Sequence, residues 1–262
     1  GRAMEVVYRR EQLERYLVTS GAYASGRPVF IDKYLDGIEL EVDAICDGRE
    51  VLVPGIMQHI ERAGVHSGDS FAVYPAVELP HEHVETLVRY TTEIALALGA
   101  RGLINIQFVL HEGTVYVLEV NPRASRTVPF LSKVTGVPMV EVATRILLGQ
   151  TLAEQGYRGG LWPRQPLVAV KAPVFSMAKL HGVDVQLGPE MKSTGEAMGV
   201  DRTFEAALAK AFLAAGLVIP PGAPVLLSLA NEDKPAGVEL ARGLVALGHP
   251  FVATEGTANY LR

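Results

Sequence analysis

Cysteine and tryptophan are almost absent from this sequence of 262 residues, which holds one of each. The single thiol of Cys46 excludes an intrachain disulfide and a metal cluster held by several thiolates, so we expect a reducing compartment such as the cytoplasm. No apolar run reaches the roughly 18–20 residues that cross a membrane, because Arg101, Asn105 and Gln107 interrupt the longest candidate, residues 94–110. We therefore expect neither a membrane span nor a secretory leader.

An excess of positive charge is also lacking. Lysine and arginine number 24 against 29 aspartates and glutamates, which gives a net charge of −5 and excludes a generally basic nucleic-acid binder. Hydrophobic residues make up 48% of the sequence, as is typical of a globular protein, and the length predicts one to two domains at about 150 residues each. The sequence opens at Gly1 without a methionine and enters an apolar segment at once, so we expect a piece of a longer protein.

Hydrophobic periodicity predicts an α+β fold for most of the chain. Period-two patterns predict strands at 4–8, 29–34, 40–46, 51–53, 103–110 and 114–120, and helical spacing predicts helices at 10–17, 80–98, 128–135, 139–148 and 202–215. Asp47-Gly48 is typical of a hairpin turn between two of these strands. The mixture of glycine, proline and polar residues at 151–173 favours a connector.

A proline-rich stretch at 220–224 predicts a linker. The pattern after it predicts a strand at 225–229, a helix at 235–247 and a strand at 251–254, which together make a β-α-β unit of an α/β domain. We therefore divide the chain into an α+β part with the hairpin (1–150), a connector with packing helices (151–219) and the start of a second domain (220–262).

Four polar side chains lie along the predicted hairpin, and their register depends on its turn. A two-residue loop pairs Gln107 with Leu118, whereas a three-residue loop pairs Gln107 with Glu119. The second register leaves one face wholly apolar and is therefore favoured. Its further pairs are Phe108 with Leu118, Ile106 with Val120 and Leu110 with Tyr116. The side chains gathered on the other face are those of Asn105, Gln107, Glu119 and Asn121.

These four side chains offer oxygen atoms and lack the nitrogen and sulfur ligands of zinc sites. A set with one carboxylate suits Mg²⁺, which keeps some waters and takes further ligands from phosphates. Arg123 and Arg126 follow the hairpin and supply the positive charge that phosphoryl transfer requires. The alternative interpretation is an ordinary solvated hairpin face.

The loop at 64–70, with the sequence GVHSGDS, is suited to phosphate binding through backbone N–H groups and small hydroxyls. An ordinary connecting loop is the alternative. Residues 32–39 could line a nucleotide pocket, in which Glu39 would accept hydrogen bonds from ribose hydroxyls. We interpret His59 and His66 as structural histidines.

Taken together, these segments resemble the large subunit of carbamoyl phosphate synthetases. The resemblance covers nearly the whole chain in order and rests on the runs GVHSGDS and NPRASRTVPFLSKVTGVP, with INIQF and GPEMKSTGEAMGVDRTF beside them. That family has two homologous ATP-grasp halves, which phosphorylate bicarbonate and carbamate. The run Thr127-Val128-Pro129-Phe130 is similar to the second, carboxy-terminal half, and the β-α-β unit resembles the start of a regulatory domain of the methylglyoxal-synthase type.

The resemblance implies roles for individual positions. Gln107, Glu119 and Asn121 match ligands of Mg²⁺ or Mn²⁺. Arg123 and Arg126 match the pair that stabilises charge on the transferred phosphoryl group. The positions that match ATP contacts are Arg2, Lys33, Leu35, Glu39, Gly64, Val65, His66, Ser67, Gln107 and Glu119, of which Lys33 departs from a histidine familiar there. The positions that match effector-phosphate contacts, with a solvated surface as the alternative, are Ser228, Lys234, Thr254 and Thr257.

The resemblance also implies a reaction, in which MgATP and carbamate yield carbamoyl phosphate and ADP during glutamine-dependent synthesis for pyrimidine and arginine biosynthesis. The implied partners are the rest of the large subunit, a glutamine amidotransferase small subunit, and a nucleotide or ornithine effector. Most of the family's phosphate loop is expected to precede Gly1, so a second hypothesis is an inactive nucleotide- or effector-binding module. A third is another ATP-grasp ligase or carboxylase, such as a biotin carboxylase.

Overall fold

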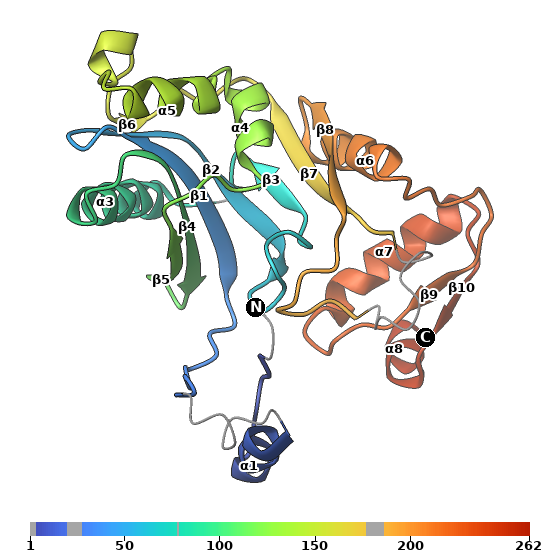
Figure 1. Cartoon of the computed structure of the whole chain (residues 1–262). Coiled ribbons are helices and arrows are strands. Elements are labelled where there is room, and N and C mark those ends of the chain that lie inside the picture. Colours follow the sequence, from blue (N-terminus) through green and yellow to red (C-terminus); the bar gives the residue numbers. More distant parts are fainter. Residues whose placement is uncertain (1–3, 20–27, 78, 177–185) are drawn as a thin grey trace. The chain divides into compact units, whose positions relative to one another are not determined.

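The structure is a computed structural model that describes residues 4–19, 28–77, 79–176 and 186–262 (Figure 1). The chain divides into two compact units, Gly1–Gly216 and Leu217–Arg262. The division falls just before the proline-rich stretch at 220–224. Among the described residues, no helix combines the length and the apolar character needed to span a bilayer.

One mixed sheet forms the centre of the first unit. Within the described residues its strands follow the order β5-β4-β1-β2-β3-β7-β8, and β6 pairs with β2 beside this path. Neighbours along the path are antiparallel, whereas β6 runs parallel to β2. The strands are β1 (Ile38–Cys46), β2 (Val51–Arg62), β3 (Ala72–Tyr74), β4 (Gly102–His111), β5 (Thr114–Asn121), β6 (Gly160–Leu161), β7 (Val168–Val174) and β8 (Gly195–Asp201).

Helices cover both faces of this sheet. On β1 the side chains of Leu40 and Val42 belong to the core under α3, whereas Ile45 belongs to the core under α4 and α5. A third core lies between α6 and strands β3 and β7. A further helix, α1, buries none of its side chains. The helices are α1 (Arg10–Thr19), α3 (His81–Ala97), α4 (Val128–Thr135), α5 (Met139–Leu147), the 3₁₀ helix η1 (Ala153–Gln155) and α6 (Phe204–Ala214).

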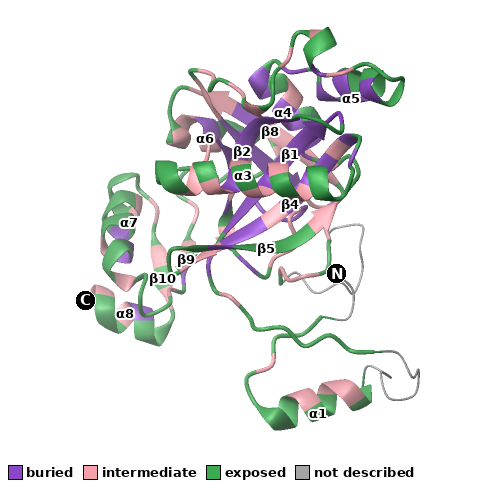
Figure 2. Ribbon diagram, turned by 90° about the vertical axis from the view of Figure 1, so that its left-hand side faces the viewer, coloured by how far each residue is buried: buried purple, intermediate pink, exposed green. Residues whose placement is uncertain are grey.

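Strand β1 is buried on both of its faces (Figure 2). Because side chains alternate along a strand, Glu39, Glu41 and Asp43 share a face with Ile45 and are nonetheless only 3%, 2% and 0% exposed. Helices α4 and α5 cover the Ile45 end of this face. The remaining part of the face therefore carries buried charge, which requires partners from other strands and loops.

Two predicted strands are wrong. Residues 4–8 and 29–34 belong to no sheet, and the side chains of Val29, Phe30 and Ile31 are exposed. Apolar and β-branched residues favour an extended backbone, but a strand also needs a neighbouring strand to share its hydrogen bonds. Neither segment has such a neighbour among the described residues.

The predicted connector at 151–173 is wrong from Gly160 onward, because this part supplies β6 and most of β7. Strand β8 is also missing from the prediction, and β2 continues to Arg62 rather than ending at Val53. Lys171 and two glycines hide the apolar pattern of β7 and β8. One of these glycines, Gly199, allows α6 to pack closely, because a Cβ there would lie 2.1 Å from the carbonyl oxygen of Ala207.

The hairpin of β4 and β5 starts in the register of a two-residue turn. Glu112 and Gly113 form this turn with positive φ angles of 48° and 75°, as a tight hairpin requires. The predicted three-residue turn is therefore wrong. The predicted pairs of Phe108 with Leu118 and Leu110 with Tyr116 are wrong for the same reason; the partners found are Val117 and Val115.

Beyond Phe108 the ladder shifts by one residue and adopts the other register. Gln107 faces Glu119, and Ile106 faces Val120, as predicted. The shift is a β-bulge in which Leu118 is the extra residue of β5.

The second unit contains two parallel strands, β9 (Val225–Leu227) and β10 (Phe251–Ala253). Helix α7 (Lys234–Ala246) connects them, and α8 (Glu255–Leu261) follows β10. This is the predicted β-α-β unit. Gly237 lets α7 approach the chain after β9, because a Cβ there would lie 2.2 Å from Leu229 Cδ1.

Candidate active site

Polar side chains form a row across one face of the main sheet. Glu41 on β1 faces Gln107 on β4, which in turn faces Glu119 on β5. On the other side of β1, Ala72 on β3 is the cross-strand partner of both His59 on β2 and Lys171 on β7. Cross-strand partners project from the same face of a sheet. The row therefore runs from β5 to β7, and residues far apart in the sequence come together on it.

The three predicted metal ligands lie at the β5 end of this row. The Asn121 amide donates from Nδ2 to Glu119 Oε1 at 2.7 Å, and the Gln107 amide donates from Nε2 to Ser67 Oγ at 3.2 Å. With both amide nitrogens engaged, the amide oxygens are the atoms left to face a cation. Asn105 does not join them, because its amide turns toward β1 instead.

This donor set fits Mg²⁺ or Mn²⁺. It has one carboxylate and two amide oxygens, and Glu119 and Asn121 are accessible enough for water and phosphate oxygens to complete the shell. Within the described parts of the chain, no cluster of three or more His, Cys, Asp or Glu side chains is arranged to hold a metal.

The glycine- and serine-containing loop at 64–70 lies over the row and is held from both sides. Lys171 Nζ donates to the Ser67 carbonyl oxygen at 2.8 Å, while Gln107 reaches the Ser67 hydroxyl. His66 Nδ1 accepts a hydrogen bond from the Gly68 amide at 3.0 Å, and burial lowers the pKa of His66, so its ring is neutral near pH 7. The loop thus presents a fixed backbone beside the candidate metal ligands.

A second segment, 188–193, anchors the same loop. The Asp69 carboxylate accepts hydrogen bonds from the backbone amides of Lys192 and Ser193, each at 2.8 Å. Ser193 Oγ donates to the Gly68 carbonyl at 2.8 Å, and the His66 amide donates to the Gly188 carbonyl at 2.8 Å. Asp69 is fully buried. The run GVHSGDS is therefore joined directly in the fold to the start of the run GPEMKSTGEAMGVDRTF.

The two predicted arginines have different surroundings. Arg126 Nη1 donates to Ser193 Oγ at 3.2 Å, and Arg126 Nε lies 3.2 Å from Glu196 Oε1. Burial raises the pKa of Glu196, although the charges of Lys171 and Arg126 oppose this. Arg123 is exposed and donates to the carbonyl oxygen of Ala124. Arg126 therefore lies beside the loop at 64–70, whereas Arg123 extends into solvent.

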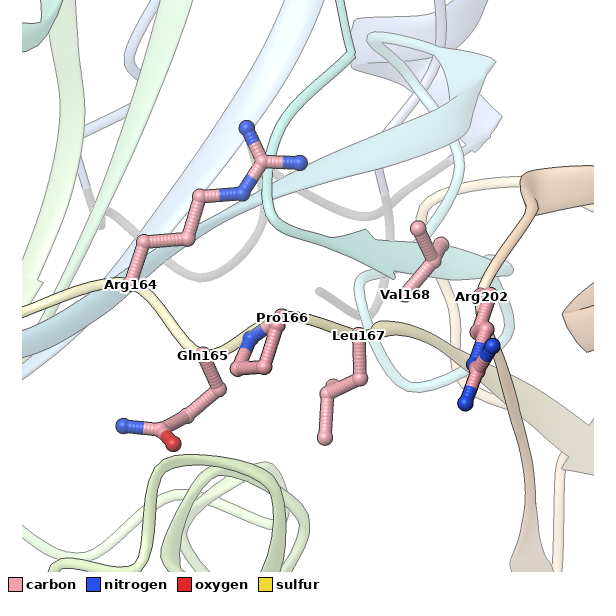
Figure 3. Close-up of a pocket in the computed structure, with 6 residues that line it drawn as sticks. All are labelled: Arg164, Gln165, Pro166, Leu167, Val168 and Arg202. Atoms are coloured by element: carbon pink, nitrogen blue, oxygen red, sulfur yellow. The ribbon is translucent and has the colours of Figure 1, made fainter.

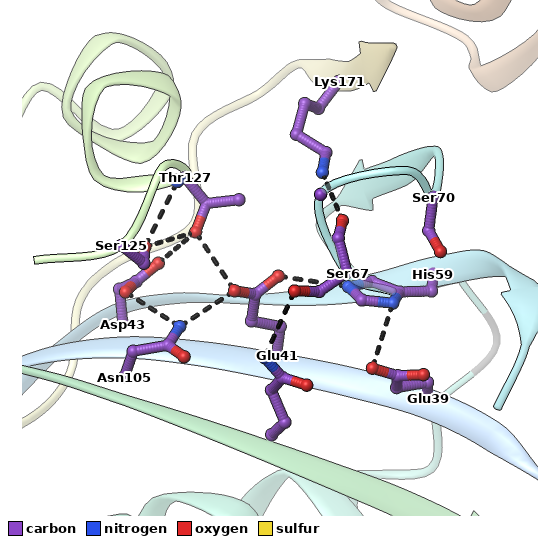
Figure 4. Close-up of polar contacts among 12 residues, drawn as sticks. Glu39, Glu41, Asp43, His59, Ser67, Ser70, Asn105, Ser125, Thr127 and Lys171 are labelled. Atoms are coloured by element: carbon purple, nitrogen blue, oxygen red, sulfur yellow. Dashed lines mark hydrogen bonds and ion pairs between the residues drawn. The ribbon is translucent and has the colours of Figure 1, made fainter. Parts of the chain in front are cut away.

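A buried ion cluster lies under the loop (Figure 4). His59 Nε2 is 3.1 Å from Glu41 Oε2, and His59 Nδ1 is 3.4 Å from Glu39 Oε1. Burial alone would lower the pKa of His59, but the two carboxylates outweigh it and raise the pKa to about 9. The histidine is therefore charged: its Nε2–H donates to Glu41, while Nδ1 lies beside Glu39 as an ion pair without a formed hydrogen bond. The interpretation of His59 as structural agrees with this position, whereas the burial of the alternating acids of β1 was not predicted from the sequence.

Most of the predicted ATP-contact residues lie in the segment before β1, in the loop at 64–70 and on the hairpin of β4 and β5. Tyr34 Oη donates to the Ala63 carbonyl at 2.7 Å, which brings the segment with Lys33 and Leu35 beside Gly64 at the start of the loop. Glu39 is nearly buried and turned toward His59. Arg2 lies outside the described residues. The remaining predicted contacts, all on the loop or the hairpin, are Val65, His66, Ser67, Gln107 and Glu119.

In the second unit, the predicted effector residues lie at the ends of β9 and β10. Thr257 Oγ1 accepts from the Leu229 amide at 3.0 Å, and Thr254 donates to Thr257 at 3.2 Å. Lys234 Nζ donates to Asn231 Oδ1 at 2.6 Å, and Ser228 is exposed. The carboxyl ends of parallel strands are the usual edge for ligands in α/β folds.

A separate pocket of about 380 Å³ is lined by residues 164–168 and Arg202 (Figure 3). Arg164 and Arg202 do not point toward one another in it. It contains none of the predicted site residues, so the polar row and not this pocket is the candidate active site.

The sheet, its covering helices and the polar row define an ATP-grasp fold. The structure resembles the biotin carboxylase domain of a single-chain bacterial carboxylase with a TM-score of 0.57 and 18% identity, over 80% of this chain and 57% of that one. It also resembles N5-carboxyaminoimidazole ribonucleotide synthetase from Thermotoga maritima, with a TM-score of 0.57 and 15% identity, over 81% and 58% of the two chains. At such identities the likeness concerns the fold, and it confirms the expected α+β ATP-grasp class.

Residues 1–155 match the family of the carbamoyl-phosphate synthase L chain, ATP binding domain, and the chain belongs to this family. It is 88% identical over all 262 residues to the carbamoyl phosphate synthase large chain of Thermomicrobium roseum. It is 55% identical over 260 residues to the corresponding large chain of Caldanaerobacter subterraneus. The chain spans 24% of the length of each of these relatives. The resemblance stated from the sequence is therefore confirmed.

Proposed function

We propose that this chain forms the nucleotide and metal surface of a carbamoyl phosphate synthetase half that phosphorylates carbamate. A carbamate oxygen attacks the γ-phosphorus of ATP in line, the bond from that phosphorus to the β,γ-bridging oxygen breaks, and ADP leaves. No protein nucleophile is needed, because positioning and charge neutralisation supply most of the catalysis.

The residues of the row divide the work. Glu119, Gln107 and Asn121 would hold Mg²⁺ or Mn²⁺ through one carboxylate and two amide oxygens. The bound metal would neutralise charge on the β- and γ-phosphates. Arg126, held by Ser193 and Glu196, directs positive charge to the same region, and Arg123 adds to it from solvent. The loop at 64–70 offers backbone N–H groups to phosphate oxygens and helps exclude water, in which carbamate is unstable.

One observation carries this proposal: Gln107 faces the candidate metal ligand Glu119 across the hairpin and donates to Ser67 Oγ on the loop at 64–70. The two features that sequence reasoning assigned to metal and to nucleotide thus share one side chain. Membership of the carbamoyl-phosphate synthase family supports carbamoyl phosphate as the product.

The test uses an intact synthetase whose large chain contains this sequence. Glu119→Gln and Asn121→Asp are each expected to lower carbamoyl phosphate formation by about 100-fold or more, because electrostatic stabilisation of the transferred group is lost. Bicarbonate-dependent ATP hydrolysis by the other half should continue. Unchanged synthesis in both variants would refute the metal assignment.

We further propose the context of this activity: a cytoplasmic enzyme with the rest of the large chain and a glutamine amidotransferase small subunit, feeding pyrimidine and arginine biosynthesis. Ser228, Lys234, Thr254 and Thr257 are proposed to bind the phosphate of a nucleotide effector, with ornithine as the alternative effector. Their gathering at the carboxyl ends of β9 and β10 supports this part of the proposal.

The second candidate function is a nucleotide- or effector-binding module without catalysis when this chain is alone. The observation that favours it is the length of the curated relatives, about four times that of this chain. Calorimetry with MgADP and with nucleoside monophosphates would detect binding, and steady ATP turnover by the chain alone would contradict it. The carboxylase hypothesis predicts instead that carbamate analogues are not turned over.

A further inference from the structure

The turn that carries Arg126 is joined to the sheet by a threonine between two carboxylates. Thr127 Oγ1 lies 2.5 Å from Asp43 Oδ2, 3.3 Å from Glu41 Oε1 and 2.7 Å from Ser125 Oγ (Figure 4). Asp43, Glu41 and Thr127 are 0%, 2% and 3% exposed. Buried polar contacts of this kind each require a proton between the two oxygens.

If Asp43 and Glu41 are both ionised, the hydroxyl groups supply one proton too few for the three contacts of Thr127 Oγ1. Thr127 and Ser125 supply one hydroxyl proton each for the three contacts around Thr127 Oγ1. The two amide protons of Asn105 are already used, toward Glu41 Oε1 at 2.8 Å and Asp43 Oδ1 at 3.0 Å. One contact between oxygens would then lack a proton, and two negative charges would meet inside the core.

A proton on Asp43 Oδ2 completes the set. The Asp43 acid then donates to Thr127, Ser125 also donates to Thr127, and the Thr127 hydroxyl donates to Glu41. The threonine oxygen accepts two hydrogen bonds and donates one, which is its full capacity. The three contacts of Thr127 Oγ1 are then satisfied without a second buried charge.

We propose that Asp43 is held as the neutral carboxylic acid and that, through Thr127, it is a positioning residue for the turn that carries Arg126. The protonated state stands on the geometry alone. The positioning role rests on the proposed function, because it matters only if Arg126 serves phosphoryl transfer.

The surroundings of Asp43 and Glu41 shift the pKa values of the two carboxyl groups in opposite directions. Burial, reinforced by the negative charge of Glu41, raises the pKa of Asp43 to about 7. Burial would also raise the pKa of Glu41, but the hydrogen bond and charge of His59 prevail, with help from Lys171 and Asn105, and lower it to about 2. The groups that touch Asp43 from β4 and from the turn are Asn105, Ser125 and Thr127, and all are neutral.

Infrared spectroscopy of the full chain tests the proton directly. At pH 6 the chain labelled with ¹³C at aspartate carboxyls should show a protonated-carboxyl band that shifts with the label and fades as the pH rises through about 7. The band should be lost in Asp43→Asn and kept in Asp47→Asn. Asp47 is a suitable control because its buried carboxylate in the unmodified chain is ionised and accepts hydrogen bonds from the Arg49, Glu50 and Leu152 amides. No labelled band in the unmodified chain at pH 6 would overturn the proposal, whether or not the variants fold.

The positioning role is tested in the intact synthetase by ATP formation from carbamoyl phosphate and MgADP, the reverse of the proposed step. Thr127→Val is expected to lower kcat by roughly 10- to 100-fold with little change in KM, because a displaced group near the reaction costs about this much. Thr127→Ser keeps the hydroxyl and should recover most of the loss. Equal losses in both variants would overturn the positioning role. Absence of the reverse reaction in the unmodified enzyme would instead contradict the proposed function.

Discussion

Gln107 and Glu119 face each other across β4 and β5, although the turn that joins their strands would by itself pair Gln107 with Leu118. The bulge at Leu118 changes the register between the turn and the site. It thereby keeps the tight turn of Glu112 and Gly113 while it brings a carboxylate and an amide to the same face. The bulge thus accommodates one extra residue of β5 without displacing the candidate metal ligands.

Deletion of Leu118 should therefore preserve the site. The ladder would continue regularly from Phe108–Val117 to Gln107–Glu119, and stabilisation of the chain by MnADP in thermal unfolding should remain within about 2 °C of the parent value. Deletion of Val120 is the matched control, because it would move Asn121 to the apolar face and abolish that stabilisation. Loss of stabilisation after both deletions would contradict the role given to the bulge.

The His59 cluster should make folding stability depend on pH. The pKa of His59 is raised to about 9 in the folded state, so its contribution is complete below the unfolded value near 6.5 and is lost as the pH rises toward and through about 9. The pKa of Glu41 is lowered to about 2, so its contribution is present above the unfolded value near 4.5 and is lost as the pH falls through about 2. The pKa of Asp43 is raised to about 7 in the folded state, so its contribution to stability is lost as the pH rises from about 4 to about 7.

Replacement of His59 by glutamine should lower the free energy of unfolding at pH 7 by about 3–5 kcal/mol, because two buried carboxylates lose their cation. Urea unfolding at several pH values would show that the decline between about pH 6.5 and 9 is flattened in this variant. The control is His81→Gln, since His81 pairs with Glu85 on an exposed helix face. A variant at position 59 that keeps the parent's pH dependence would refute the charged histidine.

Asp69 should control the attachment of the loop at 64–70 to the segment at 188–193. Asp69→Ala would leave the amides of Lys192 and Ser193 without their carboxylate, at a cost of about 1–3 kcal/mol. Hydrogen exchange of these two amides should accelerate, and nucleotide binding should weaken with it. Asp36→Ala is the control, because Asp36 forms an exposed pair with Arg62 that is worth little. Unchanged exchange at both amides would count against this attachment.

The sequence predicted the elements whose pattern is local. The helices at 128–135 and 139–148 follow from hydrophobic periodicity, and the pairing of Gln107 with Glu119 follows from the apolar face of the hairpin; the structure has both. The bulge was not predictable in this way. The two-residue turn favours a register with Gln107 opposite Leu118, whereas the polar face favours Gln107 opposite Glu119, and a ladder with a bulge combines the two registers. Strand β7 was missed because a lysine in the sequence indicates an exposed position. In the fold Lys171 is only 1% exposed, since its Nζ donates to the Ser67 carbonyl oxygen.

The buried cluster was not predictable from the spacing of its residues. Glu39, Glu41 and Asp43 alternate with apolar residues, which is the usual pattern of a strand with one solvated face. In this fold the same face is covered by a loop from 64–70 and by the turn before α4. The burial of this face depends on segments distant in the sequence, so the spacing of residues within β1 does not predict it.

The central claim is that the hairpin of β4 and β5 holds the metal ion of a bound nucleotide. Electron paramagnetic resonance of Mn²⁺ titrated into the intact synthetase with ADP measures this most directly. Glu119→Gln should remove the signal of Mn²⁺ bound at this half, while Glu112→Gln, on the exposed turn of the same hairpin, should keep it. An equal amount of bound Mn²⁺ in the Glu119→Gln variant and the parent would contradict the account.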